Sequence, residues 1–192
     1  MPRVVDRTER LDAIASAVRR VLERDGVEGV TMRNVASELG STTGLLTHWV
    51  PDRAELLHLA LKATADEQAA RATAALLRRP QDLANALDEF LPLDDARRAE
   101  MKVWLGFWAL ALSDELLQDE HRDRYRGYRS RFVDHLRELG ATASAARIAT
   151  DHLMTTVDGI ALSATFDPGY WTPARQRRHL REVVATVVPA IP

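Results

Sequence analysis

Residues 31–53 carry the pattern that most constrains this chain, because they describe two short helices separated by a tight turn. Apolar residues recur at three- and four-residue spacing over 32–39, which gives that segment one apolar helical face. Gly40 can end this helix because glycine adopts the left-handed conformation at little cost. Ser41 and Thr42 can then cap a second helix over about 42–48 through their hydroxyl oxygens. Two short helices joined in this way form a helix-turn-helix, whose second helix can enter the major groove of DNA.

The outward side chains of this segment suit contacts with DNA. Thr43 and Leu45 have the reach for base edges and thymine methyl groups, and Gly44 allows a close backbone approach. The other polar and basic residues suit phosphates. The same pattern also fits a plain three-helix unit whose polar side chains only face solvent. The predicted DNA-binding residues are Thr31, Arg33, Ser41, Thr42, Thr43, Gly44, Leu45, Thr47, His48 and Arg53.

The run GSTTGLLTHWVPDRAELL resembles the recognition-helix segment of TetR-family transcriptional regulators. Thr47 stands where that family usually has Tyr, Val50 where it has Phe, and Arg53 where it has Lys. The Thr-Gly-x-x-Thr-His-aromatic string is most similar to the BetI-type branch. The resemblance implies a dimeric repressor that binds an inverted-repeat operator in double-stranded DNA. It also implies that a small-molecule effector, bound in a C-terminal helical body, releases the operator.

Bulk charge does not by itself indicate a nucleic-acid partner. The net charge is −2, and residues 1–53 contain eight Arg against eight Asp plus Glu. Phosphate contacts usually come with a basic surface, so the electrostatic argument depends on local placement. Arg3, Arg7 and Arg10 cluster near the N-terminus, whereas Arg33 and Arg53 flank the proposed turn.

Composition narrows the class of protein further. The chain has 192 residues, 46% of them hydrophobic and 28% charged, and it contains no cysteine. Disulfides and thiolate metal sites are therefore excluded. No apolar run approaches the length of a transmembrane helix, and the charged start MPRVVDRTER lacks the apolar core of a secretory signal. We expect a cytoplasmic protein without a membrane partner.

Helical periodicity predicts an all-α fold of about nine helices. An N-terminal three-helix DNA-binding domain over 1–51 is followed by a helical effector-binding and dimerisation domain over 52–192. No pattern predicts a strand. The expected helices cover about 7–24, 32–39, 42–48, 53–78, 81–90, 94–112, 121–139, 143–166 and 173–188, with breaks at Asp25-Gly26 and over 113–120.

An aromatic stripe in the C-terminal part is the candidate effector pocket. Trp104, Phe107 and Trp108 share one helical face, and such faces more often pack a core than bind a ligand. The family resemblance favours a pocket here. Two tryptophan rings suit a quaternary ammonium group, but aromatic walls suit flat apolar molecules equally well. The predicted pocket residues are Met101, Trp104, Phe107, Trp108, His121, Tyr125 and His152.

The last two helices carry more apolar surface than one core face needs, which favours a homodimer. The alternative is that both faces are buried within one chain. The predicted interface residues are Leu153, Val157, Ile160, Ala161, Ala164, Leu180, Val184 and Val187.

No motif indicates an enzyme, a metal site or a cofactor. The sequence has no glycine-rich phosphate loop, no nucleophile elbow and no His/Glu metal motif. Two alternatives to a repressor stay open: a helical ligand-binding or adaptor protein without operator binding, and an activator with the same fold.

Overall fold

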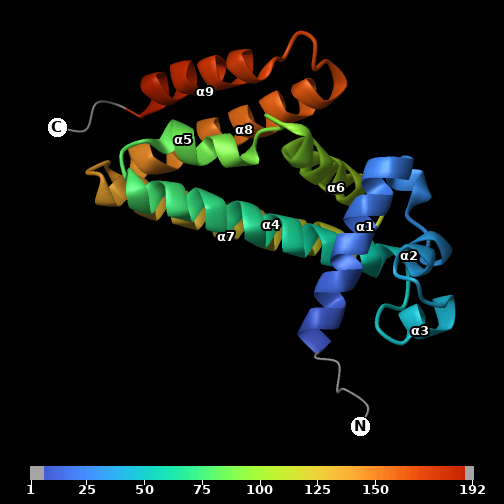
Figure 1. The fold of residues 1–192 in the computed structure, drawn as a ribbon. Coiled ribbons are helices and arrows are strands. Elements are labelled where there is room, and N and C mark those ends of the chain that lie inside the picture. The colour runs from blue at the N-terminus through green and yellow to red at the C-terminus, as the bar shows by residue number, and fades with distance from the viewer. Residues whose placement is uncertain (1–6, 189–192) are drawn as a thin grey trace. The chain divides into compact units, whose positions relative to one another are not determined.

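A computed structural model describes residues 7–188, and all regular secondary structure in this range is helical (Figure 1). The range contains nine α-helices and one short 3₁₀ helix, which confirms the predicted all-α fold. Arg3 of the N-terminal basic cluster lies outside the described residues. Between residues 7 and 188, no helix combines the length and the apolar character needed to cross a membrane.

The helices begin and end close to the positions that the sequence indicates. Their bounds are α1 Arg7–Gly29, α2 Met32–Glu38, α3 Thr43–Thr47, α4 Arg53–Arg78, α5 Leu83–Leu87, the 3₁₀ helix η1 Asp88–Phe90, α6 Asp95–Ala111, α7 Glu115–Glu138, α8 Ala143–Phe166 and α9 Pro173–Val187.

Two of the predicted breaks take a different form. Gly26 has a φ of 71°, so α1 kinks there and then continues to Gly29. The break predicted over 113–120 is much shorter, because α7 already begins at Glu115. The Asp114 carboxylate accepts hydrogen bonds from the backbone N–H groups of Leu116 and Leu117 at 3.0 and 3.2 Å, which caps the helix at this earlier point.

The described chain divides into two compact units. The first unit comprises residues 7–67 and 102–117, and the second comprises 68–101 and 118–188. Helices α4, α6 and α7 therefore contribute residues to both units. The predicted domain boundary at residue 51 falls inside the first unit. The division into a DNA-binding domain and an effector-binding domain therefore stays a prediction.

The second unit is built around the last two helices. Helices α8 and α9 pack side by side, and α5 packs on α9 (Figure 1). Part of their core is a cluster of Leu83, Leu136, Ala146 and Ala149, against which Val184 packs. The core of the second unit is therefore formed by side chains that are far apart in the sequence.

Candidate nucleic-acid interface

Helix α2 ends in a glycine turn that aims the chain into α3. Gly40 has a φ of 61°, a conformation that glycine adopts without steric cost. The Ser41 N–H donates to the Ala36 carbonyl at 2.8 Å, and the Gly40 N–H donates to the Ser37 carbonyl at 3.0 Å. This pair of bonds is a Schellman motif, which satisfies the last carbonyls of the helix and stops it.

Threonine hydroxyls begin both helices of the motif. The Thr31 Oγ1 atom accepts from the Asn34 N–H at 3.1 Å at the start of α2. The Thr42 Oγ1 atom accepts from the Leu45 N–H at 3.2 Å at the start of α3. Each bond satisfies a backbone donor that the helix itself leaves unpaired. The helix-turn-helix geometry therefore follows from two threonines and one glycine at the expected positions.

Helix α3 is anchored along one edge and exposed along the other. Leu46 and Val50 are fully buried, whereas Leu45 is 51% exposed. The other outward residues predicted for α3 are exposed as well, namely Thr42, Thr43, Gly44, Thr47 and His48. The predicted division into inward and outward residues is confirmed, with Trp49 half-buried between them. An exposed, polar, carboxylate-free surface on a short anchored helix is what insertion into a major groove requires.

Besides the capping residues Thr31 and Thr42, three more of the predicted DNA-contact residues have side chains engaged within the protein. The Ser41 Oγ atom is buried, so it does not face the solvent side of the turn. The Thr47 hydroxyl donates back to the Thr43 carbonyl within α3. The Arg53 guanidinium donates to the Val30 and Val27 carbonyls, both at 2.8 Å. Contacts of these residues with DNA stay predictions.

An ion-pair network ties α1 to α2. Glu38 accepts hydrogen bonds from Arg20 at 2.6 Å and from Arg24 at 2.8 Å. These two bonds lower the pKa of the Glu38 carboxyl. The network neutralises the only carboxylate of α2, while Arg33 is exposed on the same helix without a described ion pair. The basic charge nearest the turn is therefore available to a phosphate.

The predicted effector-pocket residues fall into both units. Trp104, Phe107 and Trp108 belong to the first unit, where the two tryptophan rings lie 5.9 Å apart and Phe107 is fully buried. Met101, His121, Tyr125 and His152 belong to the second unit. His152 is exposed on α8 and does not share the burial of the aromatic residues. The pocket as a whole stays a prediction.

A tyrosine–carboxylate pair forms the polar centre of the second unit. The Tyr125 hydroxyl donates to Asp158 Oδ1 at 3.0 Å, and the His121 ring lies 4.2 Å from the Tyr125 ring. Burial raises the pKa of Asp158 to about 6, against the Tyr125 hydrogen bond, which lowers it. Burial lowers the pKa of His121, and the nearby Arg129, Arg122 and Arg124 lower it further.

The predicted dimer residues lie mostly inside the single chain, and their contacts with a second copy stay a prediction. Six of the eight are buried: Leu153, Val157, Ile160, Ala161, Ala164 and Leu180. The other two, Val184 and Val187, pack on the cluster around Leu83. Periodicity alone placed these residues correctly on apolar faces but could not tell a core face from an interface.

A different face of α8 is exposed. Its residues recur at three- and four-residue spacing, so they form one continuous stripe along the helix. An added Cβ at Gly159, near the middle of the stripe, would meet no atom within 4 Å. The stripe consists of Ile148, His152, Thr155, Gly159, Leu162 and Phe166.

The anchored α3 with its exposed polar face defines the class of protein, a helix-turn-helix DNA-binding protein. Residues 80–189, more than half of the chain, match the family described as "BetI-type transcriptional repressor, C-terminal". The chain therefore belongs to the TetR family of transcriptional regulators, within which it groups with the BetI type. Members of this family are DNA-binding regulators and not enzymes.

Individual relatives are similar in sequence to this chain over most of its length. The HTH-type transcriptional regulator PksA of Bacillus subtilis is 29% identical over 193 residues, covering 97% of this chain and 94% of that protein. The HTH-type transcriptional regulator BetI of Vibrio parahaemolyticus is 28% identical over 176 residues, covering 88% of this chain and 86% of that protein.

Solved structures show the same fold. A Rhodococcus transcriptional regulator superposes with a TM-score of 0.83 at 26% identity, over 93% of this chain and 95% of that one. A Saccharomonospora viridis regulator, solved in complex with choline, has a TM-score of 0.79 at 21% identity, over 92% and 96% of the two chains. The second likeness shows the fold alone.

Proposed function

We propose that this protein is a transcriptional repressor that binds an inverted-repeat operator as a homodimer and is released by a small-molecule effector. The observation that carries the proposal is the exposed face of α3, held in place by fully buried Leu46. Thr43 and Leu45 project from that face, so they are the side chains that would meet base edges. Backbone phosphates would meet Thr31 and Arg33, which are exposed on α2 and its cap.

Dimerisation would use the exposed stripe of α8. Leu162 is 42% exposed and Phe166 is 76% exposed, so both apolar side chains are available to a second copy. Gly159 lies on the same stripe, between Thr155 and Leu162. Because it has no side chain, it would permit the backbones of two α8 helices to approach closely. A two-fold dimer presents two copies of α3, and its symmetry matches that of an inverted repeat.

An organic cation is the first effector class to test. The Saccharomonospora viridis neighbour was solved with choline. In the second unit of this chain, the Tyr125 hydroxyl bonds to the Asp158 carboxylate, and the His121 ring lies beside the Tyr125 ring. Ring faces and a carboxylate together attract quaternary ammonium groups. The Trp104–Trp108 pair of the first unit offers ring faces as well.

Paired binding titrations test base readout. The double variant Thr43→Ala/Leu45→Ala should weaken operator binding by about thirtyfold or more, because each of the two lost base contacts costs about 1–3 kcal/mol. Binding to random DNA at the same salt should change little, since phosphate contacts are kept. Equal losses on both DNAs would contradict base readout by α3.

A second experiment tests the dimer. Leu162→Glu/Phe166→Glu should convert the protein to a folded monomer, because two buried unpaired charges oppose association. Analytical ultracentrifugation measures the change, and Ile148→Val is the mild control on the same stripe. A dimer that survives the double variant would place the interface elsewhere.

Two alternatives keep specific support. A ligand-binding or adaptor protein without operator binding is favoured by the neutral charge of residues 1–53 and by Thr47, whose hydroxyl bonds within α3. A folded dimer that binds no specific DNA would support it. An activator would bind the operator equally well, and the position of the operator relative to the promoter would identify it.

A further inference from the structure

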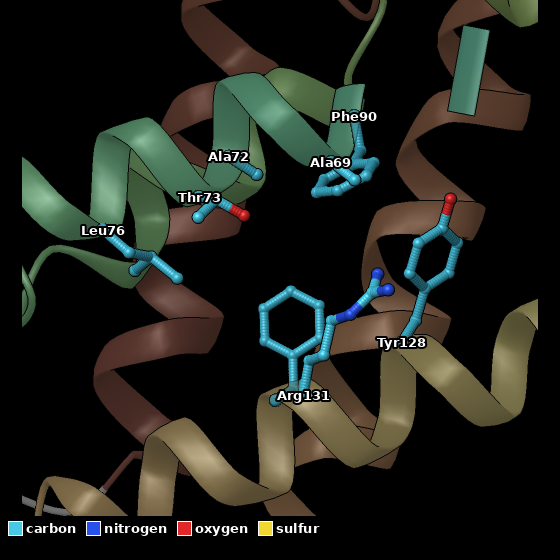
Figure 2. Close-up of a pocket in the computed structure, with 8 residues that line it drawn as sticks. Ala69, Ala72, Thr73, Leu76, Phe90, Tyr128 and Arg131 are labelled. Carbon is cyan, nitrogen blue, oxygen red and sulfur yellow. The ribbon is translucent and has the colours of Figure 1, made fainter. Parts of the chain in front are cut away.

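A half-open groove lies between α4 and α7 in the second unit, lined by residues of α4, η1 and α7 (Figure 2). Two of these residues, Leu76 and Phe132, also pack against the cluster around Leu83. Its cavity measures about 60 Å³. The α4 wall carries the short side chains of Ala69, Ala72 and Thr73, and the α7 wall carries Phe132. Because small residues face an aromatic ring, the two helices leave space between them. None of these wall residues belongs to the effector pocket predicted from the sequence.

One end of the groove is closed by aromatic rings. Phe90 of η1 contacts Tyr128 of α7 edge-on, with ring centroids 6.0 Å apart. The adjoining Tyr125 ring lies 6.0 Å from Tyr128, which continues the aromatic row toward Asp158. The groove therefore has an apolar floor and end wall, and it opens on one side to solvent. An apolar body of a few carbon atoms fits such a space.

A single charge borders this apolar space. Arg131 is the only charged residue of the lining, which contains no carboxylate. Figure 2 shows the Arg131 side chain extending from α7 toward α4, with its guanidinium on the side of the groove where Tyr128 lies. Within residues 7–188, Arg131 has no described ion-pair partner. Other arginines of the unit are paired: Arg71 with Glu89 and Glu100, and Arg97 with Glu89 and Asp94.

The combination indicates a class of ligand. A guanidinium presents paired N–H donors that match the two oxygens of a carboxylate. A cation would be repelled by the same group, and an uncharged apolar molecule would leave it unused. The Thr73 hydroxyl on the facing helix can donate a further hydrogen bond. The ligand that uses all of these features has an anionic head and a short apolar body.

We propose that the α4–α7 groove binds a small apolar carboxylate, with the carboxylate on Arg131 and the apolar body between Ala72 and Phe132. A cavity of about 150 Å³ holds a benzene ring, so a cavity less than half that size takes a chain of about three carbons. Butyrate is therefore the probe, and benzoate is a larger probe that requires Leu76 or Phe132 to move. The site differs in charge from the Tyr125–Asp158 pair, so it selects the opposite class of ligand.

The test is a calorimetric or NMR titration of the full chain with butyrate at neutral pH, without DNA. Wild-type protein should bind butyrate saturably, and tetramethylammonium should not compete. Arg131→Ala should weaken binding about tenfold or more, because it removes a charge-assisted pair. Arg131→Lys should restore part of the affinity, since it keeps the charge without the fork. Arg129→Ala, an exposed arginine on the same helix outside the lining, is the matched control and should bind normally.

A second variant tests the apolar space of the groove independently of the Arg131 charge. Ala72→Leu fills the groove from its α4 wall and should abolish binding of both carboxylates while the arginine stays in place. Far-ultraviolet circular dichroism confirms that each variant is folded. No saturable binding by folded wild-type protein would overturn the proposal, and so would binding that both Arg131→Ala and Ala72→Leu leave unchanged. Because no DNA is present, either failure leaves operator binding untouched.

Discussion

The two helices of the helix-turn-helix are capped by residues that are neighbours in the sequence, whereas the polar pairs inside the second unit join distant residues. Thr31 caps through Asn34 and Thr42 through Leu45, each three positions away. In the second unit, Tyr125 pairs with Asp158, 33 positions away, and Arg177 pairs with Asp88, 89 positions away.

This difference has a physical consequence for how each region responds to change. The threonine caps and the glycine turn keep their geometry as long as Thr31, Gly40 and Thr42 are kept, because their hydrogen-bond partners are backbone groups of nearby residues. Distant pairs depend on the packing of every helix between them. A substitution in the helix-turn-helix is therefore expected to affect mainly the bonds of the substituted residue. A substitution in the core of the second unit is expected to affect several helices at once.

Adjacent leucines of α3 give the largest contrast. Leu46→Ala should lower the free energy of unfolding by about 3 kcal/mol, because Leu46 is fully buried and truncation leaves a cavity. Leu45→Ala should leave stability within about 0.5 kcal/mol, since Leu45 is 51% exposed. Urea denaturation measures both, and similar losses for the two would mean that α3 is not anchored as described.

Asp158 should make stability depend on pH. Its pKa is raised to about 6 in the folded state, so folding favours the protonated form. The Asp158 contribution to stability should be fully present below about pH 4 and fall by about 2 kcal/mol as the pH rises from about 4 to 6, because the carboxyl must ionise in the folded state. Denaturation midpoints at pH 5 and pH 7.5 measure this change.

A substitution isolates that effect. Asp158→Asn can still accept the Tyr125 hydrogen bond but does not ionise, so it should remove this part of the pH dependence. Asp151→Asn, on the exposed side of the same helix, should not. Parallel pH profiles for wild type and Asp158→Asn would show that Asp158 is not buried as described.

Arg53 tests whether a residue at the start of α4 acts on DNA or on the fold. Arg53→Lys should cost about 1–2 kcal/mol of stability, because a lysine cannot bond the Val27 and Val30 carbonyls with a fork. Arg33→Lys, exposed on α2, should be nearly neutral for stability. Loss of operator affinity by Arg53→Lys with unchanged stability would instead show a direct phosphate contact.

The smallest expected change in stability comes from comparing Gly40→Ala with Gly44→Ala. Gly40→Ala should cost about 1 kcal/mol, because its φ of 61° strains any residue with a Cβ atom. Gly44→Ala should leave stability unchanged or slightly higher, since α3 has room for the methyl group there. Gly44→Ala should still weaken DNA binding, because the methyl group projects from the exposed face. Equal stability losses at both sites would contradict the Schellman turn.

Most of the fold could be predicted from the sequence, because helix periods, glycine stops and threonine caps act locally. The exposed and buried sides of α3 followed from the same rules. The start of α7 was placed too late, because the Asp114 cap lies within a run of polar residues that resembles a loop.

The interior of the second unit could not be predicted in the same way. Periodicity identified Leu153 and Leu180 as apolar, but their burial within one chain depends on how α8 and α9 meet. The α4–α7 groove escaped notice because Ala69, Ala72 and Arg131 carry no distinctive spacing, and only the tertiary packing brings them together. The contacts of the DNA-binding residues stay predictions.

The most direct test of the central claim is a fluorescence-anisotropy titration of the purified dimer against the DNA upstream of its own gene, with random competitor at stated salt. The account predicts a saturable complex that survives excess competitor and that Thr43→Ala/Leu45→Ala weakens selectively. A folded dimer that binds this DNA no better than random DNA, and that selects no inverted repeat from a genomic library, would contradict operator binding.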